Sequence, residues 1–86
     1  MSVIKPVIIK NVMVCKADRS LYHMYEDMFK PLVDICRKFD ATLDLTMPRQ
    51  PIVINTTAKC RRAIRSTYGM SVCNNRVGNI MYLEGF

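Results

Sequence analysis

Apolar residues in the N-terminal half follow first a strand-like and then a helical pattern. Residues 7–15, VIIKNVMVC, are rich in β-branched side chains and apolar at both alternating sets of positions, which predicts one strand covered on both faces. Asp18 or Ser20 is suited to cap a helix after it. Apolar side chains then recur at steps of four and three, at Leu21, Tyr25, Met28, Leu32, Ile35 and Phe39. Pro31 falls on the polar side of this stripe, so the pattern predicts one kinked helix curving around the core.

The period then changes to two. Residues 41–47 alternate between apolar and polar, which is typical of a half-buried strand, and residues 48–51, PRQP, interrupt the chain. A second short strand follows at residues 52–55, IVIN. The last third predicts a hairpin with a turn at residues 74–78 and a returning strand at residues 79–83. One face of its first strand would carry Ile64, Tyr68, Met70 and Val72.

This order of elements predicts an α+β fold, in which one main, kinked helix packs on a small, mostly antiparallel sheet of four to five strands. We expect a single domain spanning residues 1–86, since 50% of the residues are hydrophobic and only 23% are charged. A core this small makes a homodimer a natural supplement. No apolar run reaches the length of a membrane span, and Lys5 and Lys10 interrupt the N-terminal run without a cleavage site after it. We therefore expect a cytoplasmic protein without membrane contact.

Four cysteines lie 21, 24 and 13 residues apart, at Cys15, Cys36, Cys60 and Cys73. Because no export signal is recognised, we expect reduced thiols rather than disulfides. These spacings contain no zinc knuckle. A scattered metal site, built from all four thiols or from three of them with His23, stays open, but buried cysteines acting as small hydrophobes are favoured. We therefore expect no metal and no cofactor.

Candidate catalytic groups are few, which argues against an enzyme. His23 and Glu26 lie three residues apart, but a zinc protease requires H-E-x-x-H and a further ligand. A Cys/His dyad stays open because distance in sequence does not forbid contact, although we favour a partly exposed helix histidine beside Tyr22. Asp40 and Asp44 fall on one solvated face of a strand, and the isolated glycines build no phosphate-binding loop.

Positive charge is concentrated in the second half of the chain. Residues 1–45 hold seven Lys or Arg against six Asp or Glu, whereas residues 46–86 hold six against one. Thr56 or Thr57 is suited to cap a short helix after residue 57. The buried edge of this helix would consist of Cys60, Ala63 and Ile64. Its outer face would carry Lys59, Arg61, Arg62 and Arg65.

The predicted partner-binding site combines these cations with one more arginine and two tyrosine anchors: Lys59, Arg61, Arg62, Arg65, Arg76, Tyr68 and Tyr82. An ordinary solvated basic face is an alternative that stays open. We expect a small non-enzymatic regulatory or inhibitory protein, of the kind that phages and mobile elements encode. It would dock on the acidic surface of a host protein or protein–nucleic acid machine. The alternative function is non-specific nucleic-acid binding by the same patch, although aromatic residues for base stacking are scarce there.

Residues 51–86 resemble part of the SprT-like zinc metalloproteases. The resemblance rests on RSTYGMSVC, on NIMYL and on the preceding helix around LYHMYEDMFKPLVDICRKF. It implies a shared scaffold of strand, basic connector, glycine-bearing strand and returning strand, and an association with DNA. The H-E-x-x-H helix of that family has no counterpart in the sequence, so the resemblance carries over no site residue.

Overall fold

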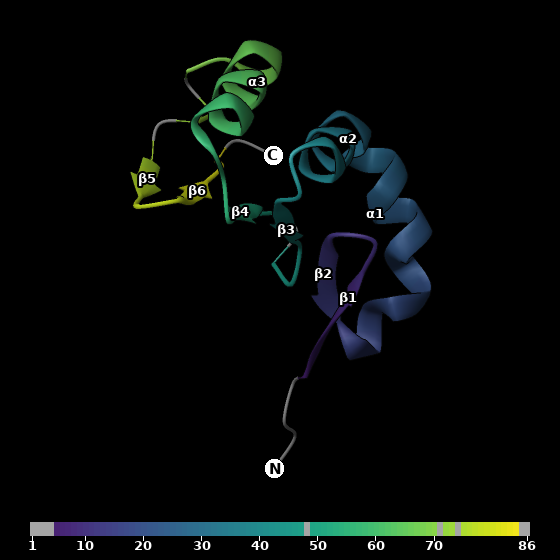
Figure 1. Cartoon of the computed structure of the whole chain (residues 1–86). Coiled ribbons are helices and arrows are strands. Elements are labelled where there is room, and N and C mark those ends of the chain that lie inside the picture. The colour runs from purple at the N-terminus through teal and green to yellow at the C-terminus, as the bar shows by residue number, and fades with distance from the viewer. Residues whose placement is uncertain (1–4, 48, 71, 74, 85–86) are drawn as a thin grey trace.

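The computed structural model describes residues 5–47, 49–70, 72–73 and 75–84. They form two layers, a six-stranded sheet and a layer of helices, which confirms the α+β class (Figure 1). The elements in chain order are β1 (Pro6–Ile9), β2 (Val12–Cys15), the 3-10 helix η1 (Lys16–Leu21), α1 (Tyr22–Met28), α2 (Lys30–Lys38), β3 (Thr42–Asp44), β4 (Ile52–Ile54), α3 (Ala58–Tyr68), β5 (Asn75–Val77) and β6 (Ile80–Tyr82). No helix among these described elements is long and apolar enough to cross a membrane.

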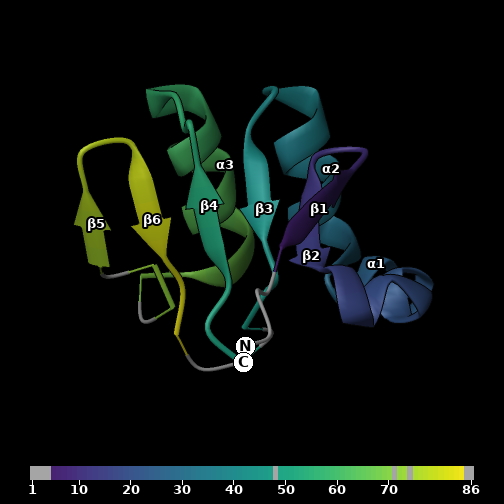
Figure 2. The same ribbon diagram turned by 90° about the horizontal axis from the view of Figure 1, so that it is seen from below.

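The strands lie in the order β1-β2-β3-β4-β6-β5. Only β2 and β3 pair in parallel, through a crossover that contains η1, α1 and α2, so the prediction of a mostly antiparallel sheet is confirmed. Helices α2 and α3 lie behind the strands in Figure 2, and no helix of the described residues covers the other face of the sheet, which we call the uncovered face. Side chains of alternating strand residues are buried under these helices: Val12, Val14, Leu43, Val53 and Met81.

The sheet has more strands than the four to five predicted, because residues 7–15 form a hairpin instead of one strand. Lys10 and Asn11 have φ angles of 47° and 72°, the two positive values that a two-residue type I′ turn requires. Ile9 pairs with Val12 across this turn. The prediction of one strand covered on both sides is therefore wrong.

The predicted kinked helix is divided into α1 and α2 by Phe29, which has φ −111° and ψ 29°. The division follows from Pro31 in the first turn of α2, since proline removes a backbone donor and disfavours helical geometry before it. The buried stripe also differs from the prediction. Leu21 and Met28 are 39% and 59% exposed, while the buried positions are Tyr22, Tyr25, Phe29, Leu32, Val33 and Cys36.

The first strand of the predicted C-terminal hairpin is wrong as well. Ile64 and Tyr68 belong to α3, which ends at Gly69 with φ 85°, and Met70 is exposed in the following loop. The hairpin itself consists of β5 and β6, joined by a turn at Gly78 and Asn79. Pro48 of the predicted break and Asn74 of the predicted turn lie outside the described residues.

Candidate functional site

Helix α3 carries the basic segment in the amphipathic arrangement that its spacing predicts. The side-chain oxygen of Thr57 accepts a hydrogen bond of 3.1 Å from the backbone N–H of Cys60, which confirms Thr57 as the N-cap. Cys60 and Ile64 are fully buried against the sheet. Lys59 and Arg62 are exposed on the outer side of the helix. Burial of one edge therefore directs these two cations toward solvent.

Arg61 holds α3 to the sheet instead of extending outward. Its guanidinium donates to the backbone oxygen and to the hydroxyl oxygen of Thr56, at 3.1 and 3.0 Å. Thr56 in turn donates from its backbone N–H and its hydroxyl to the carbonyl of Asn79, at 3.0 and 2.8 Å. These bonds join the start of α3 to the β5–β6 turn. The prediction that Arg61 faces freely outward is therefore wrong.

Arg65 is half-buried on α3, so it too departs from the predicted outward fan. Its Nε atom is buried and finds no hydrogen-bond acceptor within the part of the chain that the structure describes. The guanidinium lies near the thiol of Cys73. Burial raises the pKa of Cys73, and the charge of Arg65 opposes that rise. Of the predicted cations on α3, Lys59 and Arg62 are thus the fully accessible pair.

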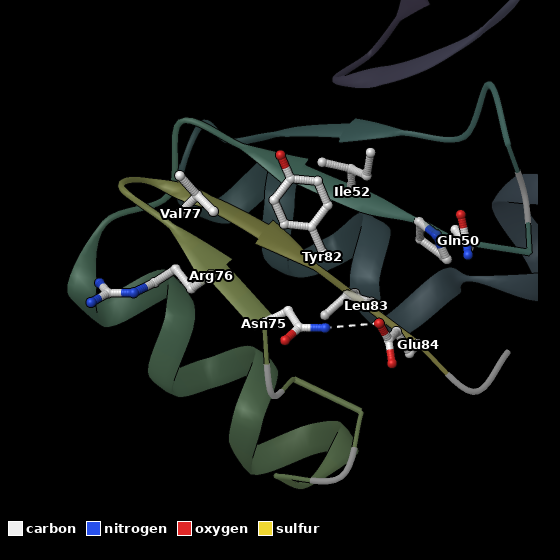
Figure 3. A pocket seen from close by; sticks show the side chains of 9 residues that line it. Gln50, Ile52, Asn75, Arg76, Val77, Tyr82, Leu83 and Glu84 are labelled. Atoms are coloured by element: carbon white, nitrogen blue, oxygen red, sulfur yellow. Dashed lines mark hydrogen bonds between the residues drawn. The ribbon is translucent and has the colours of Figure 1, made fainter.

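The remaining predicted site residues lie in different surroundings. Arg76 is exposed on β5 and pairs with Met81, whose side chain is buried on the helix side. Figure 3 shows its guanidinium pointing away from Tyr82. Tyr68 is half-buried against the core, and this burial raises its pKa. Tyr82 is 38% exposed, but it lies on the uncovered face of the sheet. Tyr82 and Arg76 nevertheless line one pocket, so the structure brings one of the two tyrosines near one of the exposed cations (Figure 3).

We call Lys59, Arg62 and Arg76 the basic surface. Because Thr56 binds Asn79, the β5–β6 turn and the start of α3 lie at the same end of the molecule. The ion pair within the described residues lies elsewhere, between Arg37 and Glu26 at 2.6 Å. No ion pair in the described ranges neutralises the basic surface, and its three charges are available to a partner.

The Arg37 network is a polar cluster that the sequence pattern did not identify. Arg37 donates from Nη2 to Glu26 and to the hydroxyl of Tyr22, both at 2.6 Å, and from Nε to the carbonyl of Lys10 at 3.0 Å. The Tyr22 hydroxyl donates to Glu26 at 2.7 Å. This bond and the guanidinium lower the pKa of Glu26. The network joins both helices of the crossover to the β1–β2 turn, which indicates a structural role. The spacing of Tyr22 and Glu26, four residues apart, is its one signal in the sequence.

His23 and the cysteines, the candidate catalytic groups, differ in their exposure. His23 is exposed, and its ring meets that of Tyr22 edge to face at 5.5 Å, as predicted. All four cysteines are free thiols, and Cys36, Cys60 and Cys73 are buried as small hydrophobes, also as predicted. Burial raises the pKa of Cys36 to about 12, which keeps it protonated at neutral pH. Within the described ranges, no three His, Cys, Asp or Glu side chains are placed to hold a metal ion together.

The uncovered face of the sheet contains a pocket that the sequence pattern did not predict. It has a volume of about 420 Å³ and lies at the end of the sheet formed by β4, β6 and β5 (Figure 3). Ile52, Val77 and Tyr82 supply apolar walls, and Asn75 donates to Glu84 at 2.8 Å beside them. Alternation in the strand sequences identifies outward residues, but only the order of the strands shows that these residues are neighbours.

Comparison of the chain with known protein families, with curated proteins and with solved structures found no match. The resemblance of residues 51–86 to SprT-like metalloproteases therefore stays a prediction.

Proposed function

We propose that the chain is a non-enzymatic binding protein that docks through its basic surface on an acidic region of a protein partner. The observation that carries this proposal is the exposure of Lys59, Arg62 and Arg76 without a neutralising ion pair among the described residues. Residues 46–83 contain no Asp or Glu, so no carboxylate within this segment neutralises its positive charges. An acidic partner supplies the missing charge.

Docking would proceed by electrostatic steering followed by contact. Exposed ion pairs contribute about 0–1 kcal/mol each, so the basic surface sets partner choice and association rate more than affinity. Regulation or inhibition would follow because the bound chain covers part of the partner's surface. A protein partner is favoured over nucleic acid because Tyr68 is half-buried and Tyr82 lies on the uncovered sheet face. Among the described residues, Tyr82 shares a pocket with a single cation of the basic surface, Arg76, and one ring does not make a stacking platform for successive bases.

A charge-matched pair of variants tests the proposal. Lys59→Glu/Arg62→Glu reverses two cations of the basic surface, and Lys16→Glu/Arg19→Glu reverses two exposed cations on η1 with the same change in net charge. Fluorescence anisotropy with a labelled polyglutamate peptide should show a dissociation constant at least tenfold higher for the first variant, and a change of less than about threefold for the second. Affinity for the wild type should fall as salt rises.

The same variants distinguish the two kinds of partner. In pull-downs from nuclease-treated lysate of cells that encode the chain, a specific protein should be recovered with the wild type and the η1 variant but lost with the α3 variant. Equal losses with both variants would show that net charge alone drives binding and would overturn the proposal. Binding to labelled single- or double-stranded nucleic acid, with none to polyglutamate, would favour the nucleic-acid alternative.

A further inference from the structure

The face of the sheet that the helices leave uncovered is mainly apolar, and no outward position of the described strands is a cation. The outward strand positions carry mainly aliphatic side chains, and Ile8, Val77 and Tyr82 are 60%, 67% and 38% exposed. Lys5, Lys10 and Lys16 are exposed at the ends of β1 and β2, and Arg76 lines the pocket. Among the outward positions of the described strands and the residue that follows β6 by two, the charged groups are Asp44 and Glu84. Both are already engaged within the chain, Asp44 with the backbone N–H of Thr46 at 2.9 Å and Glu84 with Asn75 at 2.8 Å. An exposed apolar surface of this kind marks a site of association.

The strand register places the exposed side chain of Ile8 in one row with residues that line the pocket. Cα partners run across all six strands in the order Ile8, Met13, Asp44, Ile52, Tyr82 and Asn75. Ile8 stands at the β1 end of the row, and the pocket between Ile52, Val77 and Tyr82 lies toward the β5 end. At a spacing of about 4.8 Å between strands, the two ends of the row are about 24 Å apart. The exposed side chain of Ile8 and the pocket thus lie toward opposite ends of this row.

We propose that a second copy of the chain covers this face, related to the first by a twofold axis that runs parallel to the strands between β3 and β4. This axis exchanges the two ends of the sheet, so β1 of one copy faces β5 of the other and β2 faces β6. Each Ile8 then enters the pocket of the other copy, and each Met13 lies over Tyr82, a favourable contact between a thioether and an aromatic ring. The interface is isologous and closes at two copies.

Charge favours a second copy over an acidic partner on this face. The chain has a net charge of +6, and the basic surface lies on α3 and on the helix-facing side of β5. An acidic partner would find one cation at the pocket, Arg76, and none at the outward strand positions, whereas two copies stacked sheet to sheet keep Lys59 and Arg62 of each copy apart. Association through the β5 edges is disfavoured, because antiparallel pairing centred on Arg76 would bring two guanidinium groups together.

The area of the face is consistent with a weak but specific dimer. Six strands of three or four residues span about 24–29 Å by 10–13 Å, a flat area of about 300 Å². Standard interfaces bury about 800 Å² per partner, so this face is small for a stable dimer. We therefore expect dissociation in the micromolar range.

Sedimentation equilibrium between about 1 and 500 μM tests the proposal, since this range brackets micromolar dissociation. The wild type should pass from monomer to dimer, and Ile8→Lys should raise the dissociation constant at least tenfold. Met24→Lys, at an exposed apolar position on α1, is the matched control and should leave it unchanged. Circular dichroism and thermal unfolding check that both variants keep the fold. A wild type that is monomeric throughout, or a dimer that survives Ile8→Lys but not Met24→Lys, would overturn the proposal.

Cross-linking with diamide tests the axis itself. Cys15 is a partly exposed thiol on the same face as Ile8, so both cysteine variants also carry Cys15→Ser. The double variant Ile8→Cys/Asn75→Cys then places thiols at the two ends of the row and should form covalent dimers on non-reducing gels. The single variant Ile8→Cys should behave like the wild type, because the two Ile8 positions of the dimer are about 24 Å apart. A ladder of covalent polymers, or efficient dimer formation by the single variant, would contradict the twofold arrangement. Neither test depends on the proposed function, since the basic surface is unchanged in each variant.

Discussion

The strongest test of the helical packing compares two neighbouring residues. Phe29 is 2% exposed at the break between α1 and α2, while Met28, one residue earlier, is 59% exposed. Truncating a buried phenylalanine to alanine costs about 3–5 kcal/mol, because burial energy is lost and a cavity remains. Met28→Ala removes a solvated side chain and should change stability by less than about 0.5 kcal/mol. The hydrophobic pattern alone, with Met28 in the buried stripe, predicts the opposite ranking.

The size of the stability loss expected for Phe29→Ala determines which variants can be measured. For 86 folded residues the total stability is about 4–13 kcal/mol, so Phe29→Ala risks complete unfolding. Phe29→Leu, which should cost about 1–2 kcal/mol, keeps the comparison measurable. Urea denaturation at 25 °C, followed by far-UV circular dichroism because the chain contains no Trp, gives the free energy of unfolding for each variant. A loss for Met28→Ala equal to or greater than that for Phe29→Leu would refute the burial of Phe29 and the exposure of Met28.

Three further changes probe the cap, the turn and the polar network. Thr57→Ala removes the N-cap acceptor of α3 and should lower stability by about 1 kcal/mol, or about 4–8 °C in thermal unfolding, whereas exposed Thr67→Ala should cost less than about 0.5 kcal/mol. Lys10→Gly relieves a left-handed backbone at φ 47° and should raise stability by about 0.5–1 kcal/mol; a loss in urea denaturation would contradict the type I′ turn. Folding lowers the pKa of Glu26 below its ordinary value of 4.5, so its contribution is present above that pH and is lost as pH falls through the lowered pKa. The difference in unfolding free energy between wild type and Glu26→Gln should therefore shrink on acidification, and a difference that grows would contradict the network.

Features that depend on local chemistry were predictable from the sequence. The N-cap at Thr57 and the buried positions Cys60 and Ile64 follow from residue type and helical spacing alone. Helical structure within residues 21–39 and a strand within residues 41–47 also follow from their periods, although the structure divides the helix at Phe29 and limits the strand to Thr42–Asp44. These predictions are confirmed because cap and spacing favour the same structure that tertiary packing selects.

Other features could not be predicted because the local sequence favours two alternative structures almost equally. Lys-Asn is a weaker turn pair than Asn-Gly, so the β-branched residues around it suggested an unbroken strand. The helical segment has apolar residues at two adjacent sets of positions, one containing Met28 and the other Phe29, and periodicity cannot choose between them. The 3-10 helix η1 before α1 winds more tightly than an α-helix, so a stripe extrapolated from Leu21 loses its phase.

The candidate site was only partly visible in the sequence, since it depends on contacts between distant residues. Lys59 and Arg62 are exposed, as helical spacing predicts. Arg61 binds Thr56, which is held in turn by Asn79, 23 residues further along the chain. No local pattern reveals that arrangement. The apolar outer face likewise requires the order of the strands, because single strands show alternation but not neighbours.

The two proposals together imply a bivalent binding protein. In the sheet-to-sheet dimer, the helix layers lie on the outside, so the two copies of α3 face away from each other at a separation of about 30 Å. Dimerisation does not raise the affinity for a partner that carries one acidic site. A single surface densely coated with acidic sites contacts both copies of α3 only if it extends around the dimer. Dimerisation should therefore bridge separate partner molecules rather than strengthen binding to one. Light scattering can measure this, because bridging should cross-link particles coated with polyglutamate in the presence of the wild type. Ile8→Lys should bind the same particles without cross-linking them. Cross-linking by Ile8→Lys at concentrations where it is monomeric would show that a single chain carries two sites, and the bivalent arrangement would then be wrong.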